Sequence, residues 1–372
     1  MKILFIKKHL QKGGITKVLL NRLNFLITIP SFEIHILTEF ENDPEVLKEF
    51  DSRIIIHNLN LQNLSFKKVL PIYDYFAFRR NIRKLYEEII NNLNPDIITD
   101  FDWGFYRDII PTINCRGIKI KELHGSYMGR PLLTTKRRLF EKFLDRRIEK
   151  NHNKYDLVIT LTKEDEEDRK YLSTRKMYIY NSISDQKNKS DFGNRKNVCI
   201  SIGTLTPNKN FKDLILAISK IKDKIKNWEI HIYGKGADDA NLQRLINNLS
   251  LQNIVFLKGF SDNITSVFNN AKLLVSTSLS EGLPMNLLEA LSFNIPVIAY
   301  DFKCGAKEII GQNNGSLVSL GDINVLSKEI LKYISNEKLL SDISNHIDIS
   351  HFESEMIMNQ WIYLYNSLTN EN

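Results

Sequence analysis

The segment 278–291 (SLSEGLPMNLLEAL) places two carboxylates around a glycine and a proline. Pro284 suits the first turn of a helix, and Gly282 leaves room for a ligand to approach the backbone N–H groups that follow it. Glu281 and Glu289 are eight residues apart, which is about 12 Å along the axis if the residues between them are helical. One carboxylate can then face a sugar and the other a ribose, with a diphosphate at the helix N-terminus between them. The alternative is a solvated capping Glu281 and a surface Glu289.

A second candidate anion site follows the apolar run 2–6 (KILFI), where Gly13 and Gly14 precede a helical pattern. Such a loop exposes N–H groups at the positive end of a helix. A plain turn explains the two glycines equally well. The dinucleotide fingerprint of dehydrogenases needs a third glycine that is missing here, although Glu39 stands where a ribose-binding acid would lie.

The elements that must position these residues alternate between strand and helix. Strand-like runs are expected at 2–6, 33–38, 53–56, 96–99, 117–123 and 156–161, and then at 198–203, 229–233, 253–257, 272–276 and 295–300, with helices at 211–224, 238–249 and 284–293 among them. This alternation predicts parallel, doubly wound α/β sheets. The polar segment 184–197 predicts a linker between an N-terminal domain (1–183) and a C-terminal domain (198–350). The apolar spacing of 351–372 predicts a helix that packs on its own domain or on the first one.

The charge is uneven along the chain. Of the 372 residues, the first 200 hold 36 basic and 26 acidic side chains, and the remainder hold 15 and 18. Three widely spaced cysteines give neither a disulfide framework nor a zinc pattern, which favours a reducing compartment. The first apolar run is too short for a signal-peptide core, and no run is long enough to cross a bilayer. We therefore expect a cytoplasmic protein.

The basic excess is concentrated in 116–154, where twelve basic side chains accompany four acidic ones. Within it, 134–150 has an apolar helical face among basic residues, which suits peripheral binding to an anionic membrane surface. A core-facing helix with a solvated basic side is the alternative. Nucleic acid is not expected as a partner, because no aromatic and basic recognition motif accompanies the charge.

Several motifs, in order and spacing, resemble the retaining GT-B glycosyltransferases of family 4. They are IGTL (202–205) with KNF (209–211), IYGKG (232–236), VFLKGF (255–260), the segment from Glu281 to Glu289, PVIAYD (296–301) and GAKEII (305–310). The likeness spans the chain, densely in 198–315 and thinly in 1–183. It implies a GT-B fold, two Rossmann-like domains facing each other across a cleft, with no cofactor and no metal.

The resemblance also implies roles for individual residues. Glu281 would lie beside the donor sugar, Glu289 would hold the ribose hydroxyls, and Lys209 would neutralise the departing diphosphate. The donor-binding set is Gly13, Gly14, Gly203, Thr204, Lys209, Lys258, Gly259, Phe260, Gly282, Leu283, Pro284, Met285, Asn286 and Glu289. Thr204 departs from the family, which usually has an arginine there, so one charge-assisted phosphate contact is missing.

In the first half, His124 is similar to the family's strand-end histidine that reaches the donor sugar, although a structural histidine is an equal alternative. Trp103, Tyr106 and Arg107 are candidates for an acceptor wall, because aromatic faces suit sugar rings.

The resemblance implies transfer of a sugar from a nucleoside diphosphate donor, UDP-linked by expectation, to a saccharide, lipid-linked glycan or polyol-phosphate acceptor in bacterial-type surface polysaccharide synthesis. Two alternatives stay open: a nucleotide-sugar epimerase of the same fold, and a catalytically silent nucleotide-sugar-binding protein.

Overall fold

The computed structural model describes residues 1–63, 72–101, 108–125, 150–183, 189–311 and 313–370. These residues form two compact units. Within the described ranges, one unit contains 1–124, 150–180 and 355–370, and the other contains 181–354. The candidates Trp103, Tyr106 and Arg107 and the basic stretch 134–149 lie outside the described residues.

The first unit is built on a parallel sheet of seven strands in the order β3-β2-β1-β4-β5-β6-β7. Its strands are β1 (Lys2–Lys7), β2 (Glu33–Thr38), β3 (Ile55–Asn58), β4 (Ile97–Asp100), β5 (Ile118–Leu123), β6 (Leu157–Thr160) and β7 (Arg175–Tyr178). Its helices are α1 (Gly14–Leu26), α2 (Pro44–Leu47), α3 (Ile72–Leu93), α5 (Lys163–Asp168) and α13 (Ser354–Asn370), with short 3₁₀ turns at Leu61–Asn63 and Ile110–Thr112.

The two faces of this sheet carry different cores. Leu4, Ile6 and Ile98 point to one face and pack with Ile82 and Tyr86 of α3. Side chains of opposite parity on the strands point to the other face, because successive residues of a strand alternate. Strands β4 and β6 are buried at every position, which agrees with the apolar residues that begin each of them.

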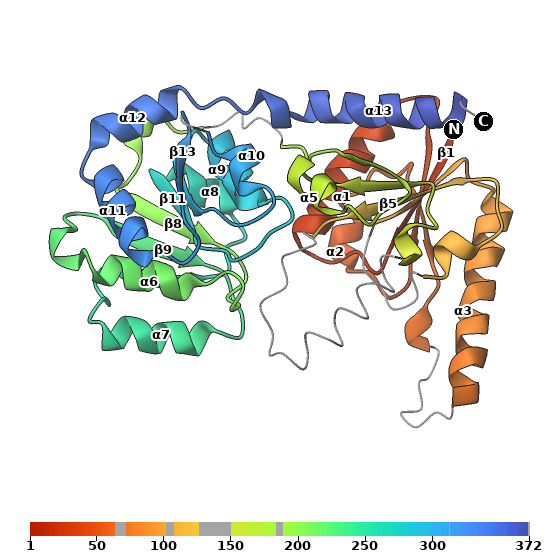
Figure 1. The fold of residues 1–372 in the computed structure, drawn as a ribbon, viewed down its shortest axis with the longest axis horizontal. Helices are drawn as coiled ribbons and strands as arrows, with labels where there is room; N and C mark the ends of the chain where they lie inside the picture. Colours follow the sequence, from red (N-terminus) through yellow and green to blue (C-terminus); the bar gives the residue numbers. More distant parts are fainter. Residues whose placement is uncertain (64–71, 102–107, 126–149, 184–188, 312, 371–372) are drawn as a thin grey trace. The chain divides into compact units, whose positions relative to one another are not determined.

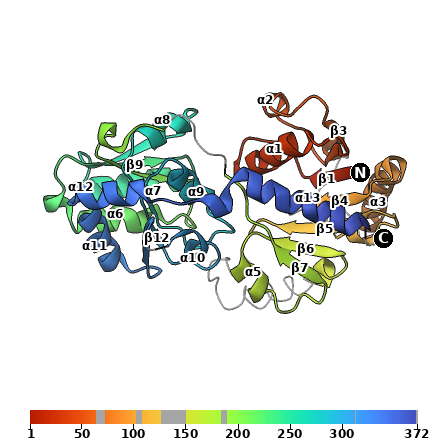
Figure 2. The ribbon, with the colours of Figure 1, turned by 90° about the horizontal axis from the view of Figure 1, so that it is seen from above.

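Helix α13 belongs to the first unit although it ends the chain. Tyr365 makes an edge contact with Phe32, the ring centroids being 6.3 Å apart, and Trp361 is 1% exposed. Figure 2 shows α13 lying along β1, β4 and β5, and Figure 1 shows it beside α1 and β1. The apolar spacing in 351–372 is therefore buried against the first sheet.

The second unit has a six-stranded parallel sheet in the order β10-β9-β8-β11-β12-β13. Its strands are β8 (Val198–Ile202), β9 (Glu229–Tyr233), β10 (Val255–Gly259), β11 (Leu273–Ser276), β12 (Val297–Tyr300) and β13 (Gly315–Val318). Its helices are α6 (Phe211–Ser219), α7 (Asp239–Asn248), α8 (Ile264–Asn269), α9 (Met285–Ser292), α10 (Ala306–Ile309), α11 (Ile323–Ile334) and α12 (Glu337–Asn345), with 3₁₀ turns at Phe192–Asn194, Lys222–Lys224 and Ser350–Phe352. Helices α6 and α7 lie on one side of this sheet and α9 and α10 on the other (Figure 1).

Both sheets confirm the parallel α/β expectation, and particular boundaries differ. The helix expected at 211–224 ends at Ser219, and the strand expected at 53–56 lies at Ile55–Asn58. Strands β7 and β13 were not predicted, because each is a short edge strand with partly exposed, mixed polar sequence.

The linker expectation does not hold for 189–197. Arg195 is 5% exposed, and its Nη2 donates to the carbonyls of Phe293 at 2.6 Å and Ser190 at 2.8 Å. The buried guanidinium of Arg195 thus joins its own segment to the C-terminal end of α9, which makes this polar segment part of the second unit.

Candidate functional site

In the second sheet the strand order reverses between β8 and β11, and loops at the carboxyl ends of these two strands meet. The amide N–H of Leu279 donates to the carbonyl of Asn208 at 2.8 Å. Asn208 Nδ2 returns a bond to the carbonyl of Ser280, also at 2.8 Å. Ligands of open α/β sheets bind at such a switch point. The topology thus brings the 202–210 and 277–286 loops together at the expected ligand end.

Lys209 and Glu281 form an ion pair where these loops meet. Lys209 Nζ lies 2.5 Å from Glu281 Oε1, and the two side chains are 23% and 16% exposed. The lysine stem passes over Gly203, where an added Cβ would lie 3.1 Å from Lys209 Cε. Thr204 is exposed beside them. Each charge therefore has its partner in the protein while both remain accessible.

The loop that carries Glu281 is not helical before α9 begins. Pro284 is the N-cap of α9 and has ψ of 93°, so the helix begins at Met285. The condition for the 12 Å separation of the two glutamates is therefore not met, because three of the seven intervening residues precede the helix. Glu289 stands one turn inside α9. The N-cap residue Pro284 makes no side-chain cap, and Asn286 Oδ1 accepts from the Leu287 N–H at 3.0 Å. The N–H groups of Met285 and Asn286 come before the first bond of the helix and can bind an anion.

Two further contacts fix this loop. Asn286 Nδ2 donates to the carbonyl of Ile202 at 3.1 Å. Gly305 has φ of +102°, and a Cβ there would lie 2.9 Å from Pro284 Cδ and 3.2 Å from the carbonyl of Gly282. Gly305 thus permits the close approach of the β12 loop to the 281–284 loop. Gly282, Leu283 and Pro284 consequently lie against a rigid backbone.

Lys258, Gly259 and Phe260 lie at the end of β10, an edge strand two positions from β8. Gly259 has φ of +70°, and its carbonyl accepts from the Gly234 N–H at 2.8 Å. Phe260 is 62% exposed, which is high for an aromatic ring. This turn and the Lys209 loop both lie at the carboxyl ends of their strands. Among the described residues, no hydrogen bond joins the turn to Lys209.

In the first unit, Gly13 and Gly14 are exposed at the start of α1, between β1 and the helix. Gly13 has extended backbone that any residue adopts, and a Cβ at either glycine would meet nothing within 4 Å. The fold of the unit therefore gives no reason for glycine at these two positions.

His124 follows β5 and its side chain is 4% exposed. Its ring centroid lies 4.2 Å from that of Phe101, and its Nε2 lies 3.3 Å from Oε2 of Glu122. Burial lowers the pKa of His124, with Glu122 opposing and Arg22 and Lys7 adding to the decrease. His124 is thus a buried, neutral imidazole at the end of a central strand.

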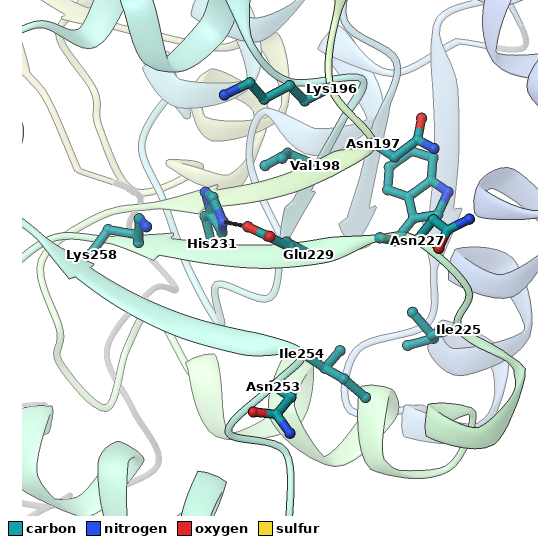
Figure 3. Close-up of a pocket in the computed structure, with 11 residues that line it drawn as sticks. Lys196, Asn197, Val198, Ile225, Asn227, Glu229, His231, Asn253, Ile254 and Lys258 are labelled. Atoms are coloured by element: carbon teal, nitrogen blue, oxygen red, sulfur yellow. Dashed lines mark hydrogen bonds and ion pairs between the residues drawn. The ribbon is translucent and has the colours of Figure 1, made fainter.

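A separate hollow of about 570 Å³ lies on the second unit (Figure 3). Its lining includes Lys196, Asn197, Asn227, Glu229 and His231, so it opens mainly at the amino ends of β8 and β9. His231 Nε2 lies 2.6 Å from Oε2 of Glu229. Apart from Lys258, this lining contains none of the predicted site residues, and it lies at the end of the sheet opposite the carboxyl-end loops.

The sequence reasoning missed Asn208, Thr277 and Asn210, which hold the two loops together. Thr277 Oγ1 donates to the carbonyls of Lys209 at 3.2 Å and Asn210 at 2.9 Å. Asn210 has φ of +48°, a conformation that asparagine tolerates well. The asparagine just before an expected helix was the signal available in the sequence.

Within the described ranges, no group of three or more His, Cys, Asp or Glu side chains is placed to hold a metal ion. Independence of metal and cofactor stays a prediction. Among the same residues, no helix combines the length and apolar character that a membrane span requires.

Comparisons with known proteins agree with this geometry. Residues 182–347 match the family of glycosyl transferases group 1. A poly(ribitol-phosphate) alpha-N-acetylglucosaminyltransferase of Staphylococcus aureus is 31% identical over 171 residues, which are 45% of this chain and 34% of that protein. A poly(glycerol-phosphate) alpha-glucosyltransferase of Bacillus subtilis is 34% identical over 139 residues, 37% of this chain and 21% of that protein. The matches thus span a third and a fifth of these relatives.

The fold itself extends over the whole chain. A TarM structure from S. aureus, in complex with fondaparinux, alpha-GlcNAc-glycerol and UDP, superposes with a TM-score of 0.78 at 19% identity and covers 98% of this chain and 99% of that one. The chain has the GT-B fold, and its residues 182–347 match the model of the glycosyl transferases group 1.

Proposed function

We propose that the protein transfers a sugar from a UDP-linked donor to an anionic polyol-phosphate acceptor, with retention at the anomeric carbon. The observation that carries the proposal is the accessible Lys209–Glu281 pair at the strand-order reversal of the second sheet.

The donor diphosphate develops negative charge as the sugar leaves. Lys209 is the one basic residue of the 202–210 and 277–286 loops, and the second of these loops leads into the N-terminus of α9, so both can face one diphosphate. Such preorganised donors stabilise a developing charge without reorganisation at the moment of reaction. When the phosphates take the ammonium of Lys209, the carboxylate of Glu281 is released towards the sugar.

The acceptor class rests on charge and on the names of the relatives. Two relatives act on polymers of ribitol phosphate and glycerol phosphate. The first 200 residues of this chain carry a net charge of +10, which favours encounter with a polyanion. We place the acceptor on the first unit for that reason. Membrane attachment through 134–150 remains a prediction about residues that the structure does not describe, apart from Lys150.

The donor arm of the test uses nucleotide sugars and three variants. UDP-GlcNAc and UDP-glucose should raise the apparent unfolding temperature by mass action, whereas ADP-glucose and GDP-mannose should not. Lys209→Ala should lower the transfer rate by about 100-fold to 1000-fold, as expected for one lost charge-stabilising donor. Glu281→Gln should lower the transfer rate by a similar factor. Lys212→Ala, an exposed lysine on α6, is the matched control and should transfer at the parent rate.

The acceptor arm compares poly(ribitol phosphate), poly(glycerol phosphate) and a neutral oligosaccharide of similar length. NMR of the product reports the anomeric configuration, which should match that of the donor. Transfer to the neutral acceptor alone contradicts the acceptor class. Donor isomerised in the absence of any acceptor identifies an epimerase, and binding without turnover across the panel identifies a silent binding protein.

A further inference from the structure

A buried ion pair joins α1 to β5 in the first unit. Arg22 Nη1 lies 2.7 Å from Glu122 Oε1, and the two side chains are 2% and 1% exposed. Two charges taken this far out of water require good geometry and further partners on their remaining atoms. Those partners identify what the pair does.

On the guanidinium side the partners are aromatic. Arg22 Cζ lies 3.7 Å from the ring centroid of Trp361 on α13 and 5.2 Å from that of Phe101 after β4. A desolvated cation over an indole face is among the stronger cation–π arrangements. The last helix of the chain therefore covers the pair, at the position where Figure 2 shows α13 along the strands.

On the carboxylate side the partner is His124. With Oε1 committed to Arg22, the other oxygen, Oε2, faces His124 Nε2 at 3.3 Å. Oε2 and both ring nitrogens are buried and make no hydrogen bond of normal geometry. An unpaired buried polar atom is costly. A small movement of the ring gives Oε2 and Nε2 a hydrogen bond.

We propose that Arg22, Glu122 and Trp361 are positioning residues for His124, with Glu122 accepting from Nε2–H, Arg22 holding Glu122 and Trp361 covering Arg22. The imidazole is then fixed as the Nε2–H tautomer, and Nδ1 is left as an acceptor. The consequence for catalysis rests on the proposed function and on the family resemblance, which implies that His124 reaches the donor sugar.

The charges that face His124 come from three elements: Glu122 on β5, Arg22 on α1 and Lys7 on β1. Glu122 raises the pKa of the imidazole, whereas Arg22 and Lys7 lower it together with burial. Removing the two members of the pair must therefore move the titration of His124 in opposite directions. A merely structural role predicts no such opposition.

The experiment is an NMR titration of labelled histidine in the full chain, with the His124 signal identified by its absence in His124→Asn. Arg22→Met should raise the pKa of His124 by about one unit or more, and Glu122→Gln should lower it and weaken the Nε2–H preference seen in the ¹⁵N shifts. Arg22→Lys retains the charge and should restore most of the parent titration. Arg169→Met removes another buried cation, paired with Asp165, and should leave His124 unmoved.

If Arg22→Met does not fold, the double variant Arg22→Met with Glu122→Gln removes both buried charges, and its His124 pKa should lie between the value expected without Arg22 and that of Glu122→Gln. If the two single variants shift the pKa of His124 in the same direction, or do not shift it, the proposed positioning role of Arg22 and Glu122 is overturned. That result is independent of the proposed function, because titration needs no donor or acceptor.

The role of α13 is tested by turnover. Trp361→Leu should lower kcat at least tenfold with the donor KM unchanged, since the proposed function assigns the diphosphate to Lys209 and the N-terminus of α9 in the second unit. Trp361→Phe keeps an aromatic face and should recover most of kcat, and Tyr363→Leu, at an exposed position of the same helix, is the control. Parent kcat in Trp361→Leu overturns the role of α13. Parent turnover in His124→Asn instead removes His124 from the proposed function and leaves the titration result standing.

Discussion

The two sheets share the strand order 3-2-1-4-5-6 and differ in how deeply their charged pairs are buried. In the second unit the Lys209–Glu281 pair stays 23% and 16% exposed. In the first unit Lys121 and Asp100 form a pair at 2.9 Å with 3% and 0% exposure, and Arg22 and Glu122 are equally buried. An accessible pair can exchange its partner for a ligand, whereas a buried pair can only organise its surroundings. One topology thus supplies a binding edge in one unit and a polar interior in the other.

The largest expected effect compares the two lysines directly. Lys121→Met removes the cation that lies 2.9 Å from the buried Asp100 carboxylate and should lower the free energy of unfolding of the first unit by about 3–5 kcal/mol. Lys209→Met should change that of the second unit by less than about 1 kcal/mol, because the pair is accessible to water. Denaturant unfolding followed with a probe in each unit measures both. Equal decreases in the free energy of unfolding in the two variants would contradict the difference between the buried and the accessible pair.

The second prediction concerns pH. Burial, with Lys121 and Arg169 adding, lowers the pKa of His152 to about 3. Below pH 6.5 the imidazole of His152 is protonated in the unfolded chain but stays neutral in the folded first unit. The free energy of unfolding therefore decreases as pH falls from 6.5 towards 3. The loss from this group is about 2 kcal/mol between pH 6.5 and 5.

His152→Gln should flatten that part of the pH dependence in the first unit. His346→Gln, on an exposed turn of the second unit, should leave it unchanged. An unaltered slope in His152→Gln contradicts the assignment of the slope to this buried imidazole.

The third prediction adds charge to the accessible site. Thr204→Arg supplies the cation that the family resemblance implies for this position and should tighten binding of the UDP-sugar about tenfold, or about 1.4 kcal/mol. Thr204→Gln controls for size without charge. Calorimetry gives both affinities, and equal values would mean that Thr204 does not face the diphosphate.

The smallest expected change in stability separates binding from folding in the first unit. Gly13→Ala should alter the free energy of unfolding by less than about 0.5 kcal/mol, because its Cβ meets nothing, yet should weaken donor binding if the loop closes on the diphosphate. Gly234→Ala is the contrasting variant. Its Cβ would lie 1.9 Å from the Gly203 carbonyl at φ of +144°, so it should disrupt the second unit. Unchanged donor affinity in Gly13→Ala removes that loop from the site.

Much of this architecture is readable from the sequence. Alternating apolar runs and helical patterns predict parallel sheets with helices on both faces, and the fully buried strands β4, β6, β11 and β12 each begin with two or three aliphatic residues. The Glu281 segment is also readable, because a proline before a helix start limits the backbone locally. The edge strands β7 and β13 were not predicted, because their partly exposed residues mix polar and apolar types and show no periodic pattern.

Only the tertiary structure decided which charges meet. Lys209 and Glu281 are 72 residues apart, and Arg22 and Glu122 are 100 apart, so their pairing depends on the strand order and not on local pattern. Trp361 reaches Arg22 from the far end of the chain because α13 packs on the first sheet. Sequence periodicity reports which face of an element is apolar, but the choice of partner for a charge is made by long-range packing. The residue types of the site were therefore determined by the sequence, and the division between accessible and buried charge was determined by the fold.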